Sequence, residues 1–192
     1  MEKNPIERFQ EVYTRAGQCG LELPEAASLA TSDKNGRPSV RVVLLKDYDE
    51  EGFVFYTNLQ SRKAKEIEQN PLVSLCFWWP PLQEQVRIEG PAEVVTAEEA
   101  DAYFATRDRE SQIGAWASHQ SDELGSIDEL AKSFESWAKK FDGGEVPRPP
   151  HWSGYRLIPE SVEFWIGKPH RLHERFLYTR QDGDWVVTIL YP

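Results

Sequence analysis

The sequence predicts an α+β protein built on an antiparallel sheet or barrel, because its strand-like and helical segments are grouped rather than alternating. Strand-like runs fill much of the first half and the last third of the chain, and Asn35-Gly36 and Asp182-Gly183 mark hairpin turns between them. Helical periodicity dominates residues 97–141 in between. No glycine-rich loop of the Rossmann or P-loop type occurs, so neither of those nucleotide-binding folds is supported.

The first half of the chain is predicted to form a helix, a three-stranded meander, a short helix and two further strands. Apolar residues at helical spacing predict a helix over residues 5–18, ended by Gly20. The Ser61 hydroxyl is a good N-cap for a helix over residues 62–69, which Pro71 ends. Runs of apolar residues predict strands over residues 27–31, 39–46, 53–57, 72–79 and 85–95.

The second half is predicted to form a helical insertion followed by strands. Thr96 and Glu99 have the spacing of a capping box, which opens a helix to residue 106. Helical pattern recurs over residues 112–118 and 127–141. Strands are expected over residues 154–157, 162–165, 171–178 and 185–190. We interpret the 192 residues as a single domain, with an N-terminal helix within residues 1–20, a helical insertion at 97–141 and C-terminal strands at 152–192.

Composition argues against several classes of partner. A net charge of −10 disfavours a nucleic acid or an anionic membrane as partner, although a local basic pocket can still hold a small anion. Cys19 and Cys76 lie far apart without metal-type spacing, so we expect no metal site and no disulfide framework, and a cytoplasmic location fits best. No apolar run is long enough for a membrane helix. The seven tryptophans are compatible with ring packing or a large interface.

The densest set of chemical groups is Arg171-Leu172-His173-Glu174-Arg175. If this segment is extended, Arg171, His173 and Arg175 point to one face of the strand. Two guanidiniums beside an imidazole repel one another unless an anion or an electron-rich ring lies between them. We therefore expect a ligand here, the alternative being a His173 that merely pairs with Glu174 or a backbone carbonyl.

A second set lies where a strand runs into a helix, at Tyr56-Thr57 followed by Ser61, Arg62 and Lys63. Free N–H groups, the helix dipole and two cations suit a phosphate. An ordinary capped helix with solvated basic residues explains the pattern equally well.

A third set comprises Tyr103, Arg107 and Ser111, whose side chains are all good phosphate partners. Tyr103 and Arg107 are four residues apart, on one helical face. The alternative, an Arg107 paired with Asp108 or Glu110 at the surface, is favoured on these residues alone.

Two strands carry weaker signals. The run Arg41 to Lys46 places its two cations on opposite faces, which also fits a plain barrel strand with charged ends. The amide of Gln85 could read the edge of a heterocycle with one donor and one acceptor, but most strand glutamines are simply exposed.

Taken together, these segments resemble the pyridoxine/pyridoxamine 5′-phosphate oxidases. The likeness runs from about residue 5 to the C-terminus and rests on motifs in the family's order: RVVLLK, FVFYTN, SRKAKEIEQNP, EQVRIEG, RDRESQIGAWAS and VEFWIGKPHRLHERFLY. The resemblance implies an FMN-binding split β-barrel with flanking helices and a homodimer with FMN at the interface. It also implies oxidation of pyridoxine or pyridoxamine 5′-phosphate to pyridoxal 5′-phosphate, with oxygen as acceptor and hydrogen peroxide as by-product.

The resemblance also implies roles for individual residues. FMN would be held by Arg41, Val42, Val43, Leu44, Leu45, Lys46, Tyr56, Thr57, Arg62, Lys63, Gln85, Gln120, Ser121, Trp165 and Arg175. The substrate would be bound by Lys46, Tyr103, Arg107, Ser111, Arg171, Leu172 and His173, with its phosphate at the first four. Arg171 and His173 would close over the pyridine ring and are the expected catalytic residues.

Two other functions stay open at this point. One is a related FMN-dependent oxidase acting on another ring, such as the phenazine-pathway enzymes of the same fold. The other is a non-catalytic split-barrel protein that carries or senses flavin or pyridoxal phosphate.

Overall fold

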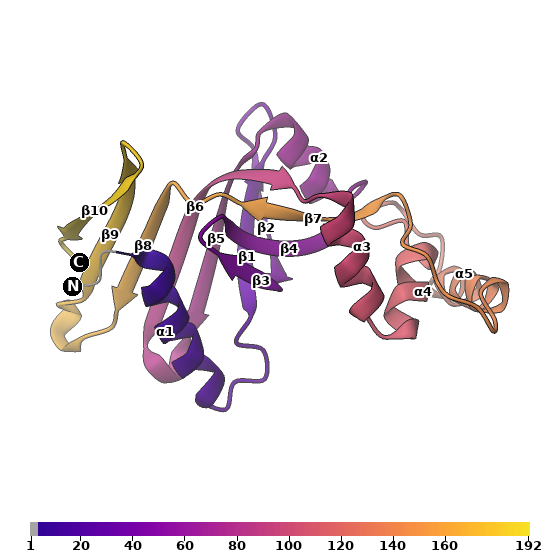
Figure 1. Cartoon of the computed structure of the whole chain (residues 1–192), viewed down its shortest axis with the longest axis horizontal. Coiled ribbons are helices and arrows are strands. Elements are labelled where there is room, and N and C mark those ends of the chain that lie inside the picture. Colours follow the sequence, from indigo (N-terminus) through magenta and orange to yellow (C-terminus); the bar gives the residue numbers. More distant parts are fainter. Residues whose placement is uncertain (1–3) are drawn as a thin grey trace.

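The computed structural model describes residues 4–192, and it confirms an α+β architecture in which every strand pair is antiparallel (Figure 1). The helices are α1 (Pro5–Gln18), α2 (Arg62–Gln69), α3 (Ala97–Thr106), α4 (Arg109–Ala117) and α5 (Ile127–Lys140). The strands are β1 (Ala26–Ser32), β2 (Pro38–Leu44), β3 (Asp47–Asp49), β4 (Gly52–Asn58), β5 (Leu72–Trp79), β6 (Glu84–Val94), β7 (Trp152–Leu157), β8 (Ser161–Ile166), β9 (Glu174–Gln181) and β10 (Asp184–Leu190). Two short 3₁₀ turns cover Pro80–Leu82 and Pro169–Arg171.

The sheet curls on itself because β6 changes its pairing partners along its length. The main path runs β10-β9-β8-β6-β5-β1-β2 and ends at β2. The first part of β6 pairs with β5 and β8, whereas Ala92, Glu93 and Val94 pair with β7, which in turn pairs with β4. Gly90 lies at this change of partner, where an added Cβ would meet the carbonyl oxygen of Ile158 at 2.0 Å.

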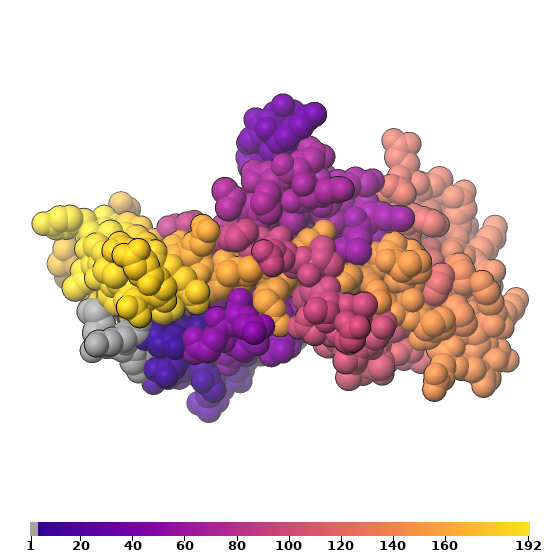
Figure 2. All heavy atoms as spheres, turned by 45° about the horizontal axis from the view of Figure 1, so that its top comes forward, coloured from indigo at the N-terminus to yellow at the C-terminus, as the bar shows by residue number. Residues whose placement is uncertain are grey.

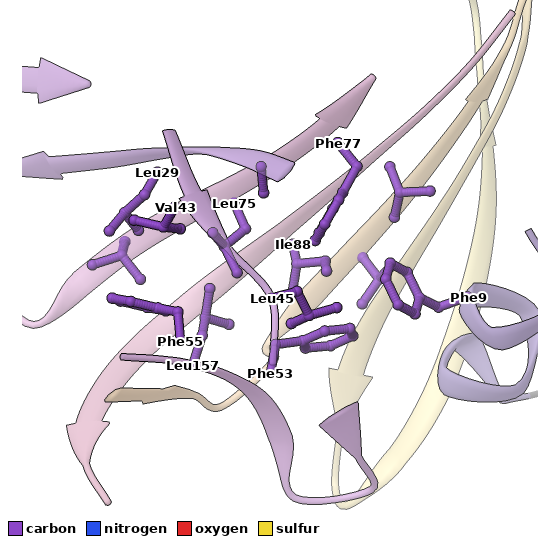
Figure 3. Packing of buried hydrophobic residues seen from close by; sticks show 14 of the residues in the cluster. Phe9, Leu29, Val43, Leu45, Phe53, Phe55, Leu75, Phe77, Ile88 and Leu157 are labelled. Atoms are coloured by element: carbon purple, nitrogen blue, oxygen red, sulfur yellow. The ribbon is translucent and has the colours of Figure 1, made fainter. Parts of the chain in front are cut away.

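The main core fills the inside of this curl (Figure 3). β5 contributes alternate residues to it: Val73 and Phe77 are buried, whereas Leu72 and Trp78 are exposed. Helix α1 covers the core with Phe9, whose ring centroid lies 4.9 Å from that of Phe53. We call the opposite side of the β10-to-β2 sheet its outer face.

Helices α3, α4 and α5 lie together at the other end of the molecule from β9 and β10 (Figure 1). They share a small second core, formed by Phe104, Ile113, Val146 and Trp152. The capping box predicted at Thr96 and Glu99 is confirmed, with both reciprocal hydrogen bonds present.

The structure corrects the predicted start of the strand at residues 171–178. β9 begins only at Glu174, because Pro169–Arg171 forms a 3₁₀ turn in which His170 and Arg171 have left-handed backbones, with φ of 59° and 61°. Arg171, His173 and Arg175 therefore do not share one face of a strand.

Two smaller expectations are also corrected, and one short strand was not predicted. The strand expected over residues 39–46 ends at Leu44, since the Lys46 N–H turns away to donate to the Val54 carbonyl. β3 was not predicted, because two aspartates in three residues disfavour a strand. Ser61 is the N-cap residue of α2, but its hydroxyl makes no capping hydrogen bond.

Candidate active site

A cavity of about 870 Å³ lies along β2, between the end of β4, the start of α2 and the α3–α4 region. The two sets of residues that the sequence analysis considered as phosphate-binding, one containing Lys63 and the other Arg107, both line this cavity. The predicted residues that line it are Arg41, Val42, Val43, Leu44, Lys46, Tyr56, Thr57, Arg62, Lys63, Tyr103, Arg107, Ser111, Gln120 and Ser121.

Lys63 is the centre of the first subsite. Its side chain is buried, and its Nζ donates to Thr57 Oγ1 and to Gln120 Oε1, each at 3.0 Å. Burial, and then the nearby positive charge of Arg41, lower the pKa of Lys63 to about 8. Because an anion would restore the charged form, this pocket is electrostatically suited to a phosphate.

Ser121 closes the same subsite from the segment after α4. Its hydroxyl accepts the backbone N–H of Arg62 at 3.2 Å, at the N-terminus of α2. The left-handed backbone of Ser121, with φ of 76°, holds the hydroxyl there.

Arg107 dominates the second subsite. Its guanidinium carbon lies 4.9 Å from the centroid of the Trp152 ring, and its Nη1 atom is buried without a hydrogen-bond partner within residues 4–192. Burial lowers the pKa of Arg107 from its usual value. Such an unsatisfied buried donor fits a site whose missing partner is an anionic ligand. The alternative pairing of Arg107 with Asp108 or Glu110 is absent among these residues, since Asp108 instead caps α4.

A stack of rings lies beside Arg107. Tyr103 stacks on Tyr56 with ring centroids 4.0 Å apart, and Tyr56 lies 5.2 Å from Trp152. Gly154 makes room for this stack, because an added Cβ would lie 2.9 Å from the Tyr56 ring.

Apart from Leu45, the remaining predicted residues form a second group that does not line the cavity: Gln85, Trp165, Arg171, Leu172, His173 and Arg175. Gln85, Trp165 and Arg175 are register partners across β6, β8 and β9, so their side chains form a row on the outer face. β9 and β10 lie at the opposite end of the molecule from α4 and α5 (Figure 2).

His173 packs on Trp165, with ring centroids 4.4 Å apart. Its Nδ1 accepts the backbone N–H of Lys168 at 3.1 Å, which leaves Nε2 as the protonated nitrogen of the neutral ring. Arg171 is exposed in the preceding turn.

Glu163 orients Arg175 and was not found by sequence reasoning. It is 3% exposed and accepts from Arg175 Nε at 2.7 Å and from Arg87 Nη2 at 2.7 Å. Its hydrogen bond raises the pKa of Arg175. A second missed carboxylate, Glu66, contacts Arg41 and Arg62 in the first subsite.

Leu45 differs from its neighbours in the expected FMN-binding run. Its side chain is 5% exposed and lies in the main core beside Phe53, not in the cavity (Figure 3). Trp152, Ser118 and Asn58 also line the cavity, although none of them is among the predicted site residues.

Neither a metal cluster nor a membrane helix is found in the part of the chain that the structure describes. No group of three or more His, Cys, Asp or Glu side chains there could hold a metal ion. No helix among residues 4–192 is long and apolar enough to cross a membrane.

Comparisons with known proteins identify the family of this chain. A family model described as "Pyridoxamine 5'-phosphate oxidase" matches residues 14–141, and one described as "Pyridoxine 5'-phosphate oxidase C-terminal dimerisation region" matches residues 152–192. A relative from Myxococcus xanthus named pyridoxine/pyridoxamine 5′-phosphate oxidase is 52% identical over 98% of this chain and 92% of its own. A relative of the same name from Bdellovibrio bacteriovorus is 50% identical over 99% and 97%.

Solved structures give the same fold. PhzG from Burkholderia lata, in complex with tetrahydrophenazine-1-carboxylic acid, has a TM-score of 0.94 at 33% identity, covering 100% of this chain and 94% of that one. An FMN-binding protein from Nostoc punctiforme, 21% identical over the whole of both chains, has a TM-score of 0.78 and supports the split-barrel fold. The chain therefore belongs to the pyridoxamine 5′-phosphate oxidase family, which implies a flavin cofactor.

Proposed function

We propose that this protein oxidises pyridoxine 5′-phosphate or pyridoxamine 5′-phosphate to pyridoxal 5′-phosphate, using FMN and molecular oxygen and releasing hydrogen peroxide. The observation that carries the proposal is the presence of two sets of phosphate-binding groups in one cavity, one around Lys63 and one around Arg107. A phosphorylated flavin beside a phosphorylated substrate requires such a pair. Relatives of that name at 52% and 50% identity support it.

The FMN phosphate is assigned to the subsite at the N-terminus of α2. Arg62 and Lys63 would meet its charge, and Gln120 and Ser121 would complete the cradle from the other side. The strand from Arg41 to Lys46, with Tyr56-Thr57, would border the rest of the flavin. When bound, FMN would supply the two-electron redox chemistry: it would accept a hydride from the substrate, and its two electrons would then reduce oxygen to hydrogen peroxide.

The substrate phosphate is assigned to Lys46, Tyr103, Arg107 and Ser111. The buried free N–H of Arg107 would gain an anionic acceptor, which makes this the strongest anchor of the four. Anchoring the phosphate fixes where the rest of the substrate lies, and positioning of this kind can be worth roughly 7–11 kcal/mol.

We assign Gln85, Trp165, Arg171, Leu172, His173 and Arg175 to the site from a second copy of the chain. Val40 and Val42 line the cavity and are 68% and 64% exposed on the outer face, so the cavity opens onto that face. The C-terminal segment that matches a dimerisation region carries β8, the 169–171 turn and β9. A homodimer joined through this face would bring the second group to the partner's cavity.

In that arrangement, Arg171 and His173 act on the pyridine ring. The protonated Nε2 of His173 could donate a hydrogen bond to the substrate or take part in proton transfer, because Nδ1 is already occupied by the Lys168 N–H. Arg171 would present a positive charge to the electron-rich ring.

A second candidate function is an FMN-dependent oxidation of a phenazine-type ring, which the TM-score of 0.94 to PhzG favours. The two functions differ in their need for a phosphate anchor. The buried nitrogen of Arg107 could pair with a phosphate or with the carboxylate of a phenazine-type acid, but Lys46, Tyr103 and Ser111 line the cavity with it, and four such groups suit the larger charge of a phosphate.

The test is product formation by the purified flavin-loaded protein. We expect pyridoxal 5′-phosphate and hydrogen peroxide to appear with the phosphorylated vitamers, and much less product with unphosphorylated pyridoxine. Equal rates with both would contradict the assigned phosphate subsite. Tight binding of the phosphorylated vitamers without formation of hydrogen peroxide would indicate the non-catalytic carrier function.

A further inference from the structure

The carboxylate of Glu66 has no part in the chemistry proposed above and does not line the cavity, yet it contacts Arg41 and Arg62, two cations of the first subsite that do. It projects from α2 and is 6% exposed. Oε2 accepts hydrogen bonds from the hydroxyls of Thr31 and Ser39 and lies 3.3 Å from Arg41 Nη2. Oε1 accepts from Arg62 Nε at 2.8 Å. One carboxylate thus joins β1, β2 and α2 beside the cavity.

This carboxylate remains charged despite its burial. Burial by itself would raise the pKa of Glu66, but hydrogen bonds from two hydroxyls and two guanidiniums lower it to about 2. A buried charge is tolerated only when paired and hydrogen-bonded in this way. In the free protein, Glu66 therefore offsets part of the charge of Arg41 and Arg62.

The two arginines differ in what their contacts leave free. Arg41 uses Nη1 and Nη2 on a carbonyl, on the hydroxyls of Thr31 and Ser39, and on Glu66. Arg62 uses only Nε, and its two terminal nitrogens donate to no group within residues 4–192. Its side chain is 58% exposed, so without Glu66 it would sample many rotamers.

We propose that Glu66 is a positioning residue for the cofactor phosphate: it fixes Arg62 through Nε so that both terminal nitrogens face the phosphate subsite. Both terminal nitrogens of Arg41 already donate hydrogen bonds within the protein, so Arg41 would attract the phosphate by its charge and not by direct hydrogen bonds. The proposal rests on the proposed function, because FMN is the ligand whose phosphate would occupy this subsite.

A purely structural role for Glu66 makes a different prediction. If Glu66 only ties α2 to the sheet, its loss weakens the fold and affects every flavin alike. If it positions Arg62, its loss affects the ligand with a phosphate and spares the ligand without one.

The experiment compares FMN with riboflavin, which has the same ring system and no phosphate. Binding of each to the full chain stripped of flavin is followed by quenching of flavin fluorescence, for wild type and Glu66→Gln. We expect FMN affinity to fall about tenfold in the variant while riboflavin affinity is unchanged, a size typical of coupling between contacting residues.

Glu84→Gln is the matched control. Glu84 is also buried, at 9% exposure, and accepts two hydrogen bonds from Arg15, at 2.8 and 2.9 Å. It does not line the cavity, and it lies on the face of β6 opposite to that of Gln85. Thermal unfolding should show a loss of stability for Glu84→Gln, while its ratio of FMN to riboflavin affinity stays that of wild type.

Arg62→Met keeps the test decisive if Glu66→Gln does not fold. Arg62 is exposed, so this variant should fold and show the same phosphate-specific loss. Where all variants fold, the double variant should lose no more than about the larger single loss, because the two residues act as one unit.

Three results would overturn the proposal. The first is an unchanged ratio of FMN to riboflavin affinity in folded Glu66→Gln. The second is tighter FMN binding, since removal of a repelling carboxylate would then be the main effect. The third is an Arg62→Met variant that binds FMN like wild type. A wild-type protein that binds neither flavin would contradict the proposed function itself and is recognised before any variant is made.

Discussion

The guanidinium of Arg107 lies against the Trp152 ring, 4.9 Å from its centroid, with Nη1 buried and unpaired within residues 4–192. An unsatisfied buried donor costs about 1–3 kcal/mol, and more when it is charged. The rings of Trp152 and Phe104, the latter with its centroid 5.6 Å from the guanidinium carbon, stabilise the cation without accepting a hydrogen bond from Nη1. The free protein therefore holds a donor that an anionic ligand in the cavity can satisfy.

Loss of this guanidinium should weaken substrate binding selectively. Hydrogen bonds to charged groups contribute about 1.5–3 kcal/mol, so Arg107→Met should raise KM for the phosphorylated vitamers by roughly ten- to a hundredfold. Steady-state kinetics would measure this, and FMN affinity should be unchanged. Arg109→Met is the control, since Arg109 donates to the carbonyls of Phe141 and Gly144 outside the cavity. Similar KM values for both variants would contradict the assignment.

FMN affinity should fall as pH rises through the pKa of Lys63. Burial and Arg41 lower that pKa to about 8 in the free protein, whereas a bound phosphate would raise it. Binding therefore takes up a proton, so affinity should be lower at about pH 9.5 than at about pH 7, a range over which the flavin phosphate is mostly in its doubly ionised form. Fluorescence titration would measure the dependence. It should be flatter in Lys63→Met, and an equal slope in that variant would assign the titration to another group.

The same lysine gives the opposite trend in the stability of the flavin-free protein. Above about pH 8 the folded form has lost the proton that the unfolded form keeps up to about pH 10.5, so this residue's contribution to the free energy of unfolding rises with pH. In denaturant titrations above about pH 8, the free energy of unfolding should rise more steeply with pH for wild type than for Lys63→Met. A shallower rise for wild type than for the variant would contradict the lowered pKa of Lys63.

Gly154→Ala should damage both the fold and the substrate subsite. The new methyl group would lie 2.9 Å from the Tyr56 ring, which is stacked on Tyr103. Overpacking of this kind costs about 1–3 kcal/mol, and displacement of Tyr56 should also raise KM. Gly17 lies in α1, and an added Cβ there would meet no atom of residues 4–192 within 4 Å, so Gly17→Ala should instead stabilise the protein by up to about 1 kcal/mol. Thermal unfolding would show whether Gly154→Ala lowers the stability of the protein while Gly17→Ala raises it.

Mixed dimers test whether two chains share each site. Arg107→Met and Arg171→Ala should each reduce turnover strongly as homodimers. If the two residues come from different chains, a mixed dimer has one intact site, and random reassortment should restore about a quarter of wild-type activity. Activity of an equimolar mixture after subunit exchange is the measurement. No recovery, despite proven exchange, would place both residues in one chain's site.

Local signals predicted much of the fold. Helices α1, α2 and α3 have the predicted bounds, because apolar periodicity, Pro71 and the capping box at Thr96 are read from neighbouring residues. The Asp182-Gly183 turn is confirmed by the positive φ of both residues, 51° and 93°.

Features set by distant contacts could not be predicted in the same way. The run after Pro169 looks extended, but His170 and Arg171 adopt left-handed backbones that residue type alone does not require. In the sequence, Glu66 looks like a surface residue of a polar helix. It is buried because Thr31, Ser39 and Arg41, which belong to strands distant in the sequence, pack around its carboxylate. The family resemblance named both groups of site residues, but it did not indicate that only one of the two groups lines the cavity within a single chain.

The most direct test of the central claim is anaerobic mixing of the FMN-loaded protein with pyridoxamine 5′-phosphate and, separately, with pyridoxine 5′-phosphate, followed by the visible absorbance of the flavin. We predict that at least one of the two bleaches the flavin band, and that the band returns on admission of air. A bound flavin that neither compound reduces would keep the fold and contradict the proposed substrate.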